Sequence, residues 1–84
     1  MKKIIIYTKE NCPYCIKAKK LLEKKHLSYE EIDVTGQDEM REKLVELSGG
    51  RKTVPQIFIG DYHVGGCDDL YAMEEEGELD KLLV

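Results

Sequence analysis

Near its start the sequence passes from an apolar, β-branched run into a helix start that carries cysteine and proline. No other feature constrains the fold as strongly. Residues 3–8 (KIIIYT) are typical of a short buried strand. Pro13 fits the first turn of a helix, where its missing N–H is not needed. Apolar residues then recur at helical spacing: Tyr14, Ala18, Leu21 and Leu22. The sequence therefore predicts a strand that leads into a helix ending near Lys25, with Cys12 and Cys15 where the two meet.

A second strand and a second helix are predicted next. Residues 28–34 (SYEEIDV) are typical of a strand, and the polar break at Gly36 leads into a helix that stops at Gly49 and Gly50. The apolar residues on one face of this helix are Met40, Leu44 and Leu47. We expect this stripe, and Phe58 further along the chain, to lie in the core.

Two short strands joined by a tight turn are predicted after the second helix. Residues 56–59 and 62–64 have strand character, and the glycine–aspartate pair at 60–61 is a turn signal. These two strands should pair antiparallel. The first two strands are separated by a helix, so they should be parallel and connected by a right-handed crossover.

A third helix completes the predicted fold. Asp68 or Asp69 can cap its start, and Gly77 should break it. The apolar residues in and beyond it are Tyr71, Met73, Leu79, Leu82 and Leu83. The element order is therefore β-α-β-α-β-β-α, which predicts a single α/β domain over residues 1–84, built on a four-stranded mixed sheet with helices on both faces.

The composition argues against several classes of function. The net charge of -4 disfavours nucleic acid as a partner, because phosphate binding requires a basic surface. No apolar run approaches the length that spans a membrane, and the run after MKK ends too soon for a signal peptide. Three cysteines are too few for a secreted disulfide framework. We therefore expect a cytoplasmic monomer with no nucleic-acid or membrane partner.

The spacing of Cys12 and Cys15 suits thiol–disulfide exchange. A helix N-terminus carries partial positive charge and free N–H groups, which stabilise a thiolate. Cys12 should lie at the helix end, exposed and able to attack a disulfide. Cys15 should lie one turn inside, covered but close enough to resolve the mixed disulfide. Lys9 either adds positive charge beside the thiolate or is an ordinary surface lysine.

The same pair can also bind a metal or staple a fold. A structural zinc site takes four ligands, and only Cys67, His26 and His63 are left to complete one. We therefore expect no metal site, with His26 at the end of the first helix and His63 on an edge strand, both solvated. A structural staple is disfavoured by the reducing compartment expected for this chain.

Three segments resemble the glutaredoxin family, and in particular its small bacterial dithiol type. They are CPYC at 12–15 following YTK, TVPQIFI at 53–59, and GGCDDL at 65–70. The resemblance implies a thioredoxin-like fold and a glutathione-dependent thiol–disulfide oxidoreductase. In that chemistry Cys12 is the nucleophile and Cys15 the resolving cysteine.

The resemblance also implies that the substrate binds opposite the thiol pair. In glutaredoxins the proline at the position of Pro55 is cis and faces the CxxC motif. The backbone of Thr53 and Val54 is then available to bond the substrate cysteine as an added strand. The alternative is that Pro55 only marks the start of a strand.

The segment from Gly66 to Asp68 forms the other half of the implied glutathione site. Glycine allows a close backbone approach, and the helix start at Cys67 and Asp68 offers N–H groups to the γ-glutamyl carboxylate. The Asp68 carboxylate would bind the ammonium group of glutathione, or cap the helix, or do both. Asp69 is expected to be a cap or a surface residue. The thiol of Cys67 is either a small buried group or a site of modification.

The glycine carboxylate of glutathione requires a cation. By resemblance we assign Lys9 and Arg41 to it, with Gln37 as an alternative hydrogen-bonding partner. The basic pair at 51–52 should lie beside the groove that binds glutathione. Tyr14 is expected to flank glutathione, and simple packing is its alternative role.

The resemblance implies a cycle with no bound cofactor and glutathione as co-substrate. Expected partners are glutathionylated proteins and protein disulfides such as that of ribonucleotide reductase, with glutathione reductase recycling the oxidised product. Two alternatives remain open: a redoxin supplied by thioredoxin reductase, and a binder of a metal or an iron–sulfur cluster.

Overall fold

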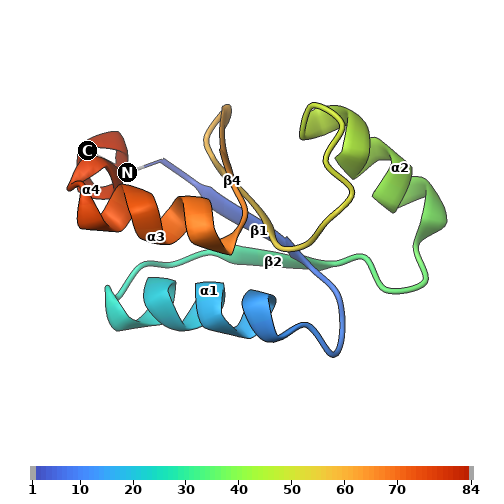
Figure 1. The fold of residues 1–84 in the computed structure, drawn as a ribbon, viewed down its shortest axis with the longest axis horizontal. Helices are drawn as coiled ribbons and strands as arrows, with labels where there is room; N and C mark the ends of the chain where they lie inside the picture. The colour runs from blue at the N-terminus through green and yellow to red at the C-terminus, as the bar shows by residue number, and fades with distance from the viewer. Residues whose placement is uncertain (1, 84) are drawn as a thin grey trace.

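The computed structural model describes residues 2–83 as a sheet of four strands with four helices around it (Figure 1). The elements are β1 (Ile4–Thr8), α1 (Pro13–Lys24), β2 (Glu30–Asp33), α2 (Asp38–Leu47), β3 (Gln56–Ile59), β4 (Tyr62–Gly65), α3 (Cys67–Glu75) and α4 (Glu78–Leu83). The predicted order is confirmed, with one refinement. The break at Gly77, which has a φ of 74°, starts a separate short helix, α4.

The sheet is mixed, as predicted. Its strand order is β2-β1-β3-β4; β1 is parallel to β2, while β3 is antiparallel to both β1 and β4. Ile6 at the middle of β1 pairs with Glu31 of β2 on one side and with Ile57 of β3 on the other. The sheet therefore has β1 and β3 at its centre, and the loops that follow β1 and precede β3 emerge close together.

One face of the sheet carries the hydrophobic core. The buried cluster consists of Ile4, Ile6, Ala18, Leu21, Leu22, Ile57, Ile59, Cys67, Leu70, Leu79 and Leu83. Figure 1 shows α1 and α3 side by side, and these two helices supply the cluster's helical members together with α4. Burial of these aliphatic side chains is the main stabilising contribution to the fold.

The opposite face of the sheet is only partly covered, and here the core prediction is wrong for three residues, Phe58, Met40 and Leu47. Phe58 is half-buried and packs its ring against Tyr7 and His63. Met40 and Leu47 are 37% and 50% exposed, although Leu44 between them is buried. Figure 1 shows α2 set apart from the other helices, at the far end of the molecule from α4. Only the narrow side of α2 that carries Leu44 therefore reaches the rest of the protein.

Candidate active site

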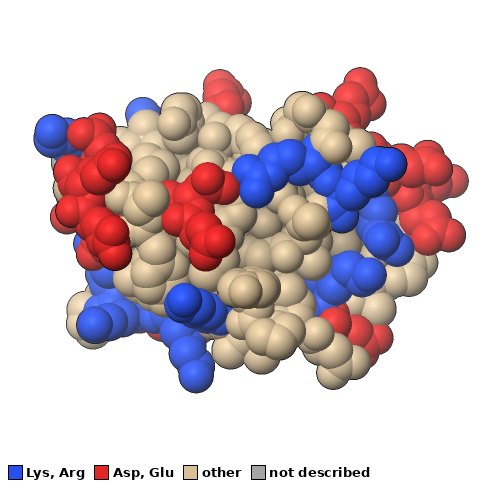
Figure 2. Space-filling model, in the orientation of Figure 1, with Lys and Arg blue, Asp and Glu red and all other residues tan. Residues whose placement is uncertain are grey.

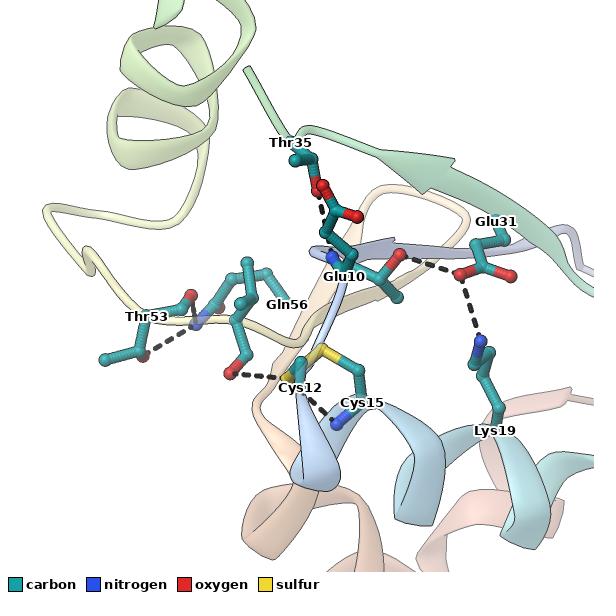
Figure 3. Close-up of a disulfide and its surroundings, with 10 residues drawn as sticks. Glu10, Cys12, Cys15, Lys19, Glu31, Thr35, Thr53 and Gln56 are labelled. Atoms are coloured by element: carbon teal, nitrogen blue, oxygen red, sulfur yellow. Dashed lines mark hydrogen bonds and ion pairs between the residues drawn. A yellow bond between two sulfur atoms is a disulfide. The ribbon is translucent and has the colours of Figure 1, made fainter. Parts of the chain in front are cut away.

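Cys12 and Cys15 lie at the start of α1, where the chain turns out of β1. Asn11 adopts a left-handed conformation with a φ of 57°, which asparagine tolerates better than most residues. Cys12 is the N-cap of α1, and its Sγ accepts the N–H of Cys15 at 3.1 Å. The two cysteines form a disulfide, with their Cα atoms 5.2 Å apart (Figure 3).

The two sulfurs differ in exposure as the sequence predicts. Cys15 is 1% exposed and lies against the core, whereas Cys12 is only partly buried. In the reduced protein, the Cys15 N–H and the N-terminal end of α1 would both stabilise a thiolate on Cys12. The arrangement therefore suits an outer sulfur that attacks and an inner sulfur that resolves.

A polar cluster joins β1, β2 and α1 near the end of β1 that leads into the active-site turn. The hydroxyl of Thr8, the last residue of β1, donates to Glu31 Oε2 at 2.7 Å. Lys19 Nζ from α1 reaches the same oxygen at 3.0 Å (Figure 3). The Thr8 hydroxyl, and after it Lys19, hold the pKa of Glu31 below its ordinary value. These contacts link β1, β2 and α1 directly behind the active-site turn.

The loop before β3 faces the outer sulfur. The peptide between Val54 and Pro55 is cis, as the resemblance implied, and the Val54 carbonyl oxygen lies 3.8 Å from Cys12 Sγ. The side chain of Gln56 donates from Nε2 to the carbonyl oxygen of Thr53 at 3.0 Å (Figure 3). Backbone groups of this loop are thus presented at the thiol pair.

The turn from β4 into α3 forms the third part of the site, and Asp69 caps the helix there, as expected. The N-cap position is occupied by Gly66, which excludes the alternative role of Asp68 as the N-cap residue. Asp69 at the third helical position reaches back instead, and its Oδ2 accepts the Gly66 N–H at 2.8 Å. Gly65 has a φ of 116°, and a side chain there would collide with the Asp69 carboxylate.

An ion pair joins this turn to the loop before β3. Arg51 Nη1 lies 3.0 Å from Asp69 Oδ2. The Gly66 N–H, and after it Arg51, hold the pKa of Asp69 below its ordinary value. Asp68 is exposed beside this pair. The ion pair was not foreseen, because the two residues lie 18 positions apart in the sequence.

These segments enclose a pocket of about 210 Å³ next to the thiols. Its lining residues are Tyr14, Arg51, Thr53, Val54, Pro55, Gly66, Cys67, Asp68 and Asp69. The structure thus brings together seven of the nine predicted substrate-binding residues. The two that it omits, Lys9 and Arg41, line an adjoining pocket.

The adjoining pocket is larger, at about 540 Å³, and has a basic rim. Its lining residues are Lys9, Val34, Asp38, Arg41, Glu42, Leu44, Val45, Arg51, Lys52, Thr53 and Val54. Figure 2 shows Lys and Arg side chains gathered on the side of the molecule that carries α2. The expected basic residues at 51–52 therefore lie beside the groove, and Arg51 contributes to both pockets.

Burial bears on two alternatives that the sequence left open for individual side chains. Tyr14 is 59% exposed at the pocket rim, which contradicts the packing alternative. Cys67 is 4% exposed, and burial raises the pKa of its thiol. Cys67 is therefore held as a protonated, apolar-like side chain and not as a second nucleophile.

His26 agrees with the prediction, whereas His63 lies on an edge strand as predicted but is not a solvated side chain. His26 is exposed and follows α1 in a left-handed conformation with a φ of 59°, as expected at a helix end. His63 is half-buried on β4, and its Nε2 lies 2.7 Å from Gln56 Oε1. The only sequence signal for this contact is a polar residue, Gln56, at the start of an otherwise apolar strand.

Within residues 2–83, no group of three or more His, Cys, Asp or Glu side chains is arranged to hold a metal ion. None of the helices in the described part of the chain is both long enough and apolar enough to cross a membrane.

Comparison with known proteins points to one family. The family model described as Glutaredoxin matches residues 4–64. Glutaredoxin 1 of Rickettsia prowazekii is 63% identical over 81 residues, which cover 95% of this chain and 85% of that protein. The solution structure of glutaredoxin from Brucella melitensis is 57% identical with a TM-score of 0.87, covering 99% of this chain and 89% of its own. A crystal structure of a buckwheat glutaredoxin–glutathione complex is 31% identical with a TM-score of 0.88, and the match covers 98% of this chain and 76% of that chain.

Proposed function

The chain belongs to the glutaredoxin family of glutathione-dependent thiol–disulfide oxidoreductases, and we propose how its residues divide the reaction. Cys12 is the nucleophile and Cys15 the resolving cysteine. The observation that carries this assignment is the Cys15 N–H, which is directed at Cys12 Sγ from 3.1 Å away. This contact favours a thiolate at the outer position and keeps the inner sulfur within bonding reach.

With a glutathionylated protein the proposed route needs one cysteine. The Cys12 thiolate attacks the glutathione sulfur of the mixed disulfide, a Cys12–glutathione bond forms, and the protein thiolate leaves and takes up a proton. The thiolate of a second glutathione then attacks that bond. Oxidised glutathione leaves, and the Cys12 thiolate is restored.

With a protein disulfide the proposed route needs both cysteines. Cys12 attacks one substrate sulfur and forms a mixed disulfide, and the other substrate sulfur leaves as a thiolate. Cys15, after losing its proton, attacks Cys12, which releases the reduced substrate. The product is the Cys12–Cys15 disulfide of the structure, which glutathione then reduces.

The smaller pocket is proposed to hold the γ-glutamyl end of glutathione. Backbone N–H groups of Cys67 and Asp68, at the start of α3 behind Gly66, would bind its carboxylate, and the Asp68 side chain its ammonium group. Support comes from the position of these residues around one pocket beside Cys12, and from the exposure of the Asp68 side chain.

The remaining contacts of glutathione are proposed on both sides of the cis peptide. The backbone of Thr53 and Val54, held in place by Pro55, would bond the cysteinyl unit as an added strand. Lys9 and Arg41 on the rim of the larger pocket would attract the glycine carboxylate. The exposed ring of Tyr14 would cover the ligand from the α1 side. The buckwheat glutaredoxin, whose structure contains glutathione, supports this choice of ligand.

The proposed partners follow from this chemistry. They are glutathionylated proteins and proteins with reducible disulfides, including ribonucleotide reductase, with electrons returned through glutathione and glutathione reductase. We propose that the protein works as a monomer in the cytoplasm, where glutathione keeps the disulfide reducible. No bound cofactor takes part in the proposed cycle.

A coupled assay tests the proposal. A glutathionylated peptide is supplied with glutathione, glutathione reductase and NADPH as the only electron source, and NADPH oxidation is followed. We expect turnover that depends on the protein and is absent with the C12S variant. Absence of turnover in the fully reduced protein would contradict the proposal, and turnover only with thioredoxin reductase would assign the electrons to a different donor.

A further inference from the structure

A network of three hydrogen-bond contacts made by Gln56 connects the edge strand β4 to the loop before β3. Gln56 is completely buried, with 0% exposure, at the first position of β3. Its Nε2 donates to the carbonyl oxygen of Thr53 at 3.0 Å and lies 3.4 Å from the Thr53 hydroxyl. Its Oε1 lies 2.7 Å from Nε2 of His63. Every polar atom of this buried amide therefore has a partner, as burial requires.

The direction of these bonds fixes the role of the histidine. The amide nitrogen of Gln56 faces two oxygens of Thr53, so the amide oxygen must be the atom that faces His63. An amide oxygen only accepts, and Nε2 of His63 must therefore carry the proton. That condition is met by one neutral tautomer and by the imidazolium alike. The ring is held in this orientation by Phe58, at 4.8 Å between ring centroids and an interplanar angle of 31°.

At its other end this hydrogen-bond network reaches the loop that faces the reactive sulfur. Thr53 directly precedes Val54, whose carbonyl oxygen is 3.8 Å from Cys12 Sγ. Thr53 and Val54 lie outside the helices and strands, between α2 and β3. Their backbone is therefore held by side-chain contacts such as the one from Gln56 to Thr53. His63 lies two steps removed from the sulfur and does not touch it.

We infer that Gln56 and His63 are positioning residues for thiol exchange, which hold the Thr53–Val54 backbone at the distance from Cys12 that substrate docking requires. The inference rests on the proposed function, because it concerns the loop to which the substrate backbone would bind. His63 donates its Nε2–H to Gln56 Oε1 and so supports the amide orientation that directs Gln56 Nε2 at Thr53. In the other orientation the amide oxygen would face the Thr53 carbonyl oxygen, and two acceptors would repel each other.

Two substitutions at His63 separate the hydrogen bond from packing. H63F keeps an aromatic ring against Phe58 and removes the donor. H63Q loses the ring and places an N–H near the position of Nε2. We expect H63F to raise KM for the glutathionylated peptide about tenfold with little change in kcat, and H63Q to stay near the wild type. H26N, at the exposed histidine that follows α1, is the matched control and should leave both constants unchanged.

A second readout depends on neither glutathione nor turnover. The Val54 carbonyl oxygen can accept the S–H of reduced Cys12 and so favours the protonated thiol. If the loop loosens, the pH midpoint for alkylation of Cys12 by iodoacetamide should fall. We expect this shift in H63F and not in H63Q, each measured in a C15S background. A merely structural role for His63 would not move this midpoint.

The outcomes divide clearly. A normal H63F variant overturns the inference, and so does equal impairment of H63F and H63Q, which would assign the effect to packing against Phe58.

Urea denaturation checks that the variants fold. If H63F does not fold, the Q56M variant decides, because it keeps the side-chain length and removes the amide. Q56M is expected to reproduce the loss, and a normal Q56M overturns the inference. Inactive wild-type protein with a shifted H63F midpoint would instead contradict the proposed function and leave the loop contact supported.

Discussion

The two walls of the active site are built in different ways. The helix wall is the segment Cys12–Cys15 at the start of α1, a single run of sequence whose geometry follows from one N-cap and one helical turn. The loop wall consists of Thr53–Pro55 and Gly66–Asp69, two distant segments joined by the pair of Arg51 with Asp69. The reactive sulfurs thus depend on local structure, whereas the surface proposed to bind glutathione depends on tertiary contacts. Substitutions in the two walls should therefore fail in different ways.

The largest expected effect comes from the helix wall. C12S should abolish reduction of both glutathionylated peptides and protein disulfides, because no other described cysteine is exposed enough to attack. C15S should lose protein-disulfide reduction and retain deglutathionylation, which needs only the outer sulfur. The coupled assay with each substrate measures both activities. Equal loss of deglutathionylation in C12S and C15S would exclude the one-cysteine route.

A substitution in the core beneath both walls should act through stability. Ile57 is fully buried in β3, directly after the loop wall and paired with β1, which leads to the helix wall. I57A should lower the free energy of unfolding by about 3 kcal/mol, since it removes buried methyl groups and leaves a cavity. Urea denaturation measures the change. I16A is the matched control, because Ile16 is 49% exposed on α1, and it should cost less than about 1 kcal/mol. Similar losses in the two variants would contradict the assigned core.

Within the loop wall, Asp68 tests recognition without touching the thiols. D68N keeps the shape of the side chain and removes the charge proposed to bind the ammonium group of glutathione. We expect KM for the glutathionylated peptide to rise about tenfold with kcat nearly unchanged, because a charge-assisted hydrogen bond is lost. D61N, in the exposed turn between β3 and β4, is the control. An unchanged KM in D68N would remove Asp68 from the binding surface.

The smallest expected effect is on acid stability. The pKa of Asp69 is lowered in the folded protein, first by the Gly66 N–H and then by Arg51. A lowered carboxyl pKa contributes stability above the ordinary value of about 4, and that contribution disappears as the pH falls through the lowered pKa. D69N should therefore be less stable than the wild type near neutral pH, by about 1 kcal/mol or less because the pair is partly exposed. The difference in free energy of unfolding should shrink below about pH 4, and a constant difference would contradict the ionic contribution.

The helix wall could be predicted from the sequence because every contact in it is local. A strand that meets Pro13 determines where α1 begins, and helical periodicity then places Cys12 outside and Cys15 inside. The same reasoning located most strands and helices, since each rests on short-range patterns of apolar and turn residues. The cis peptide before Pro55 was foreseen only through the family resemblance.

The loop wall could be predicted only in part, because its contacts join residues far apart in the chain. No sequence pattern pairs Arg51 with Asp69, and the polar Gln56 in an apolar strand does not by itself identify His63 as its partner. The exposure of Met40 could not be foreseen either, since periodicity identifies an apolar side of α2 and not how much of that side reaches the sheet. Recognition surfaces assembled in this way require the three-dimensional structure.

Trapping glutathione on the protein tests most directly the claim that one wall reacts and the other binds. C15S protein is incubated with oxidised glutathione, and the modified residue is identified by mass spectrometry after digestion. We expect one glutathione, carried by Cys12, with the adduct forming more slowly when D68N is added to the same background. An adduct on Cys67, or none on Cys12, would contradict the assignment of the reactive sulfur. An unchanged rate with D68N would contradict the division between the two walls.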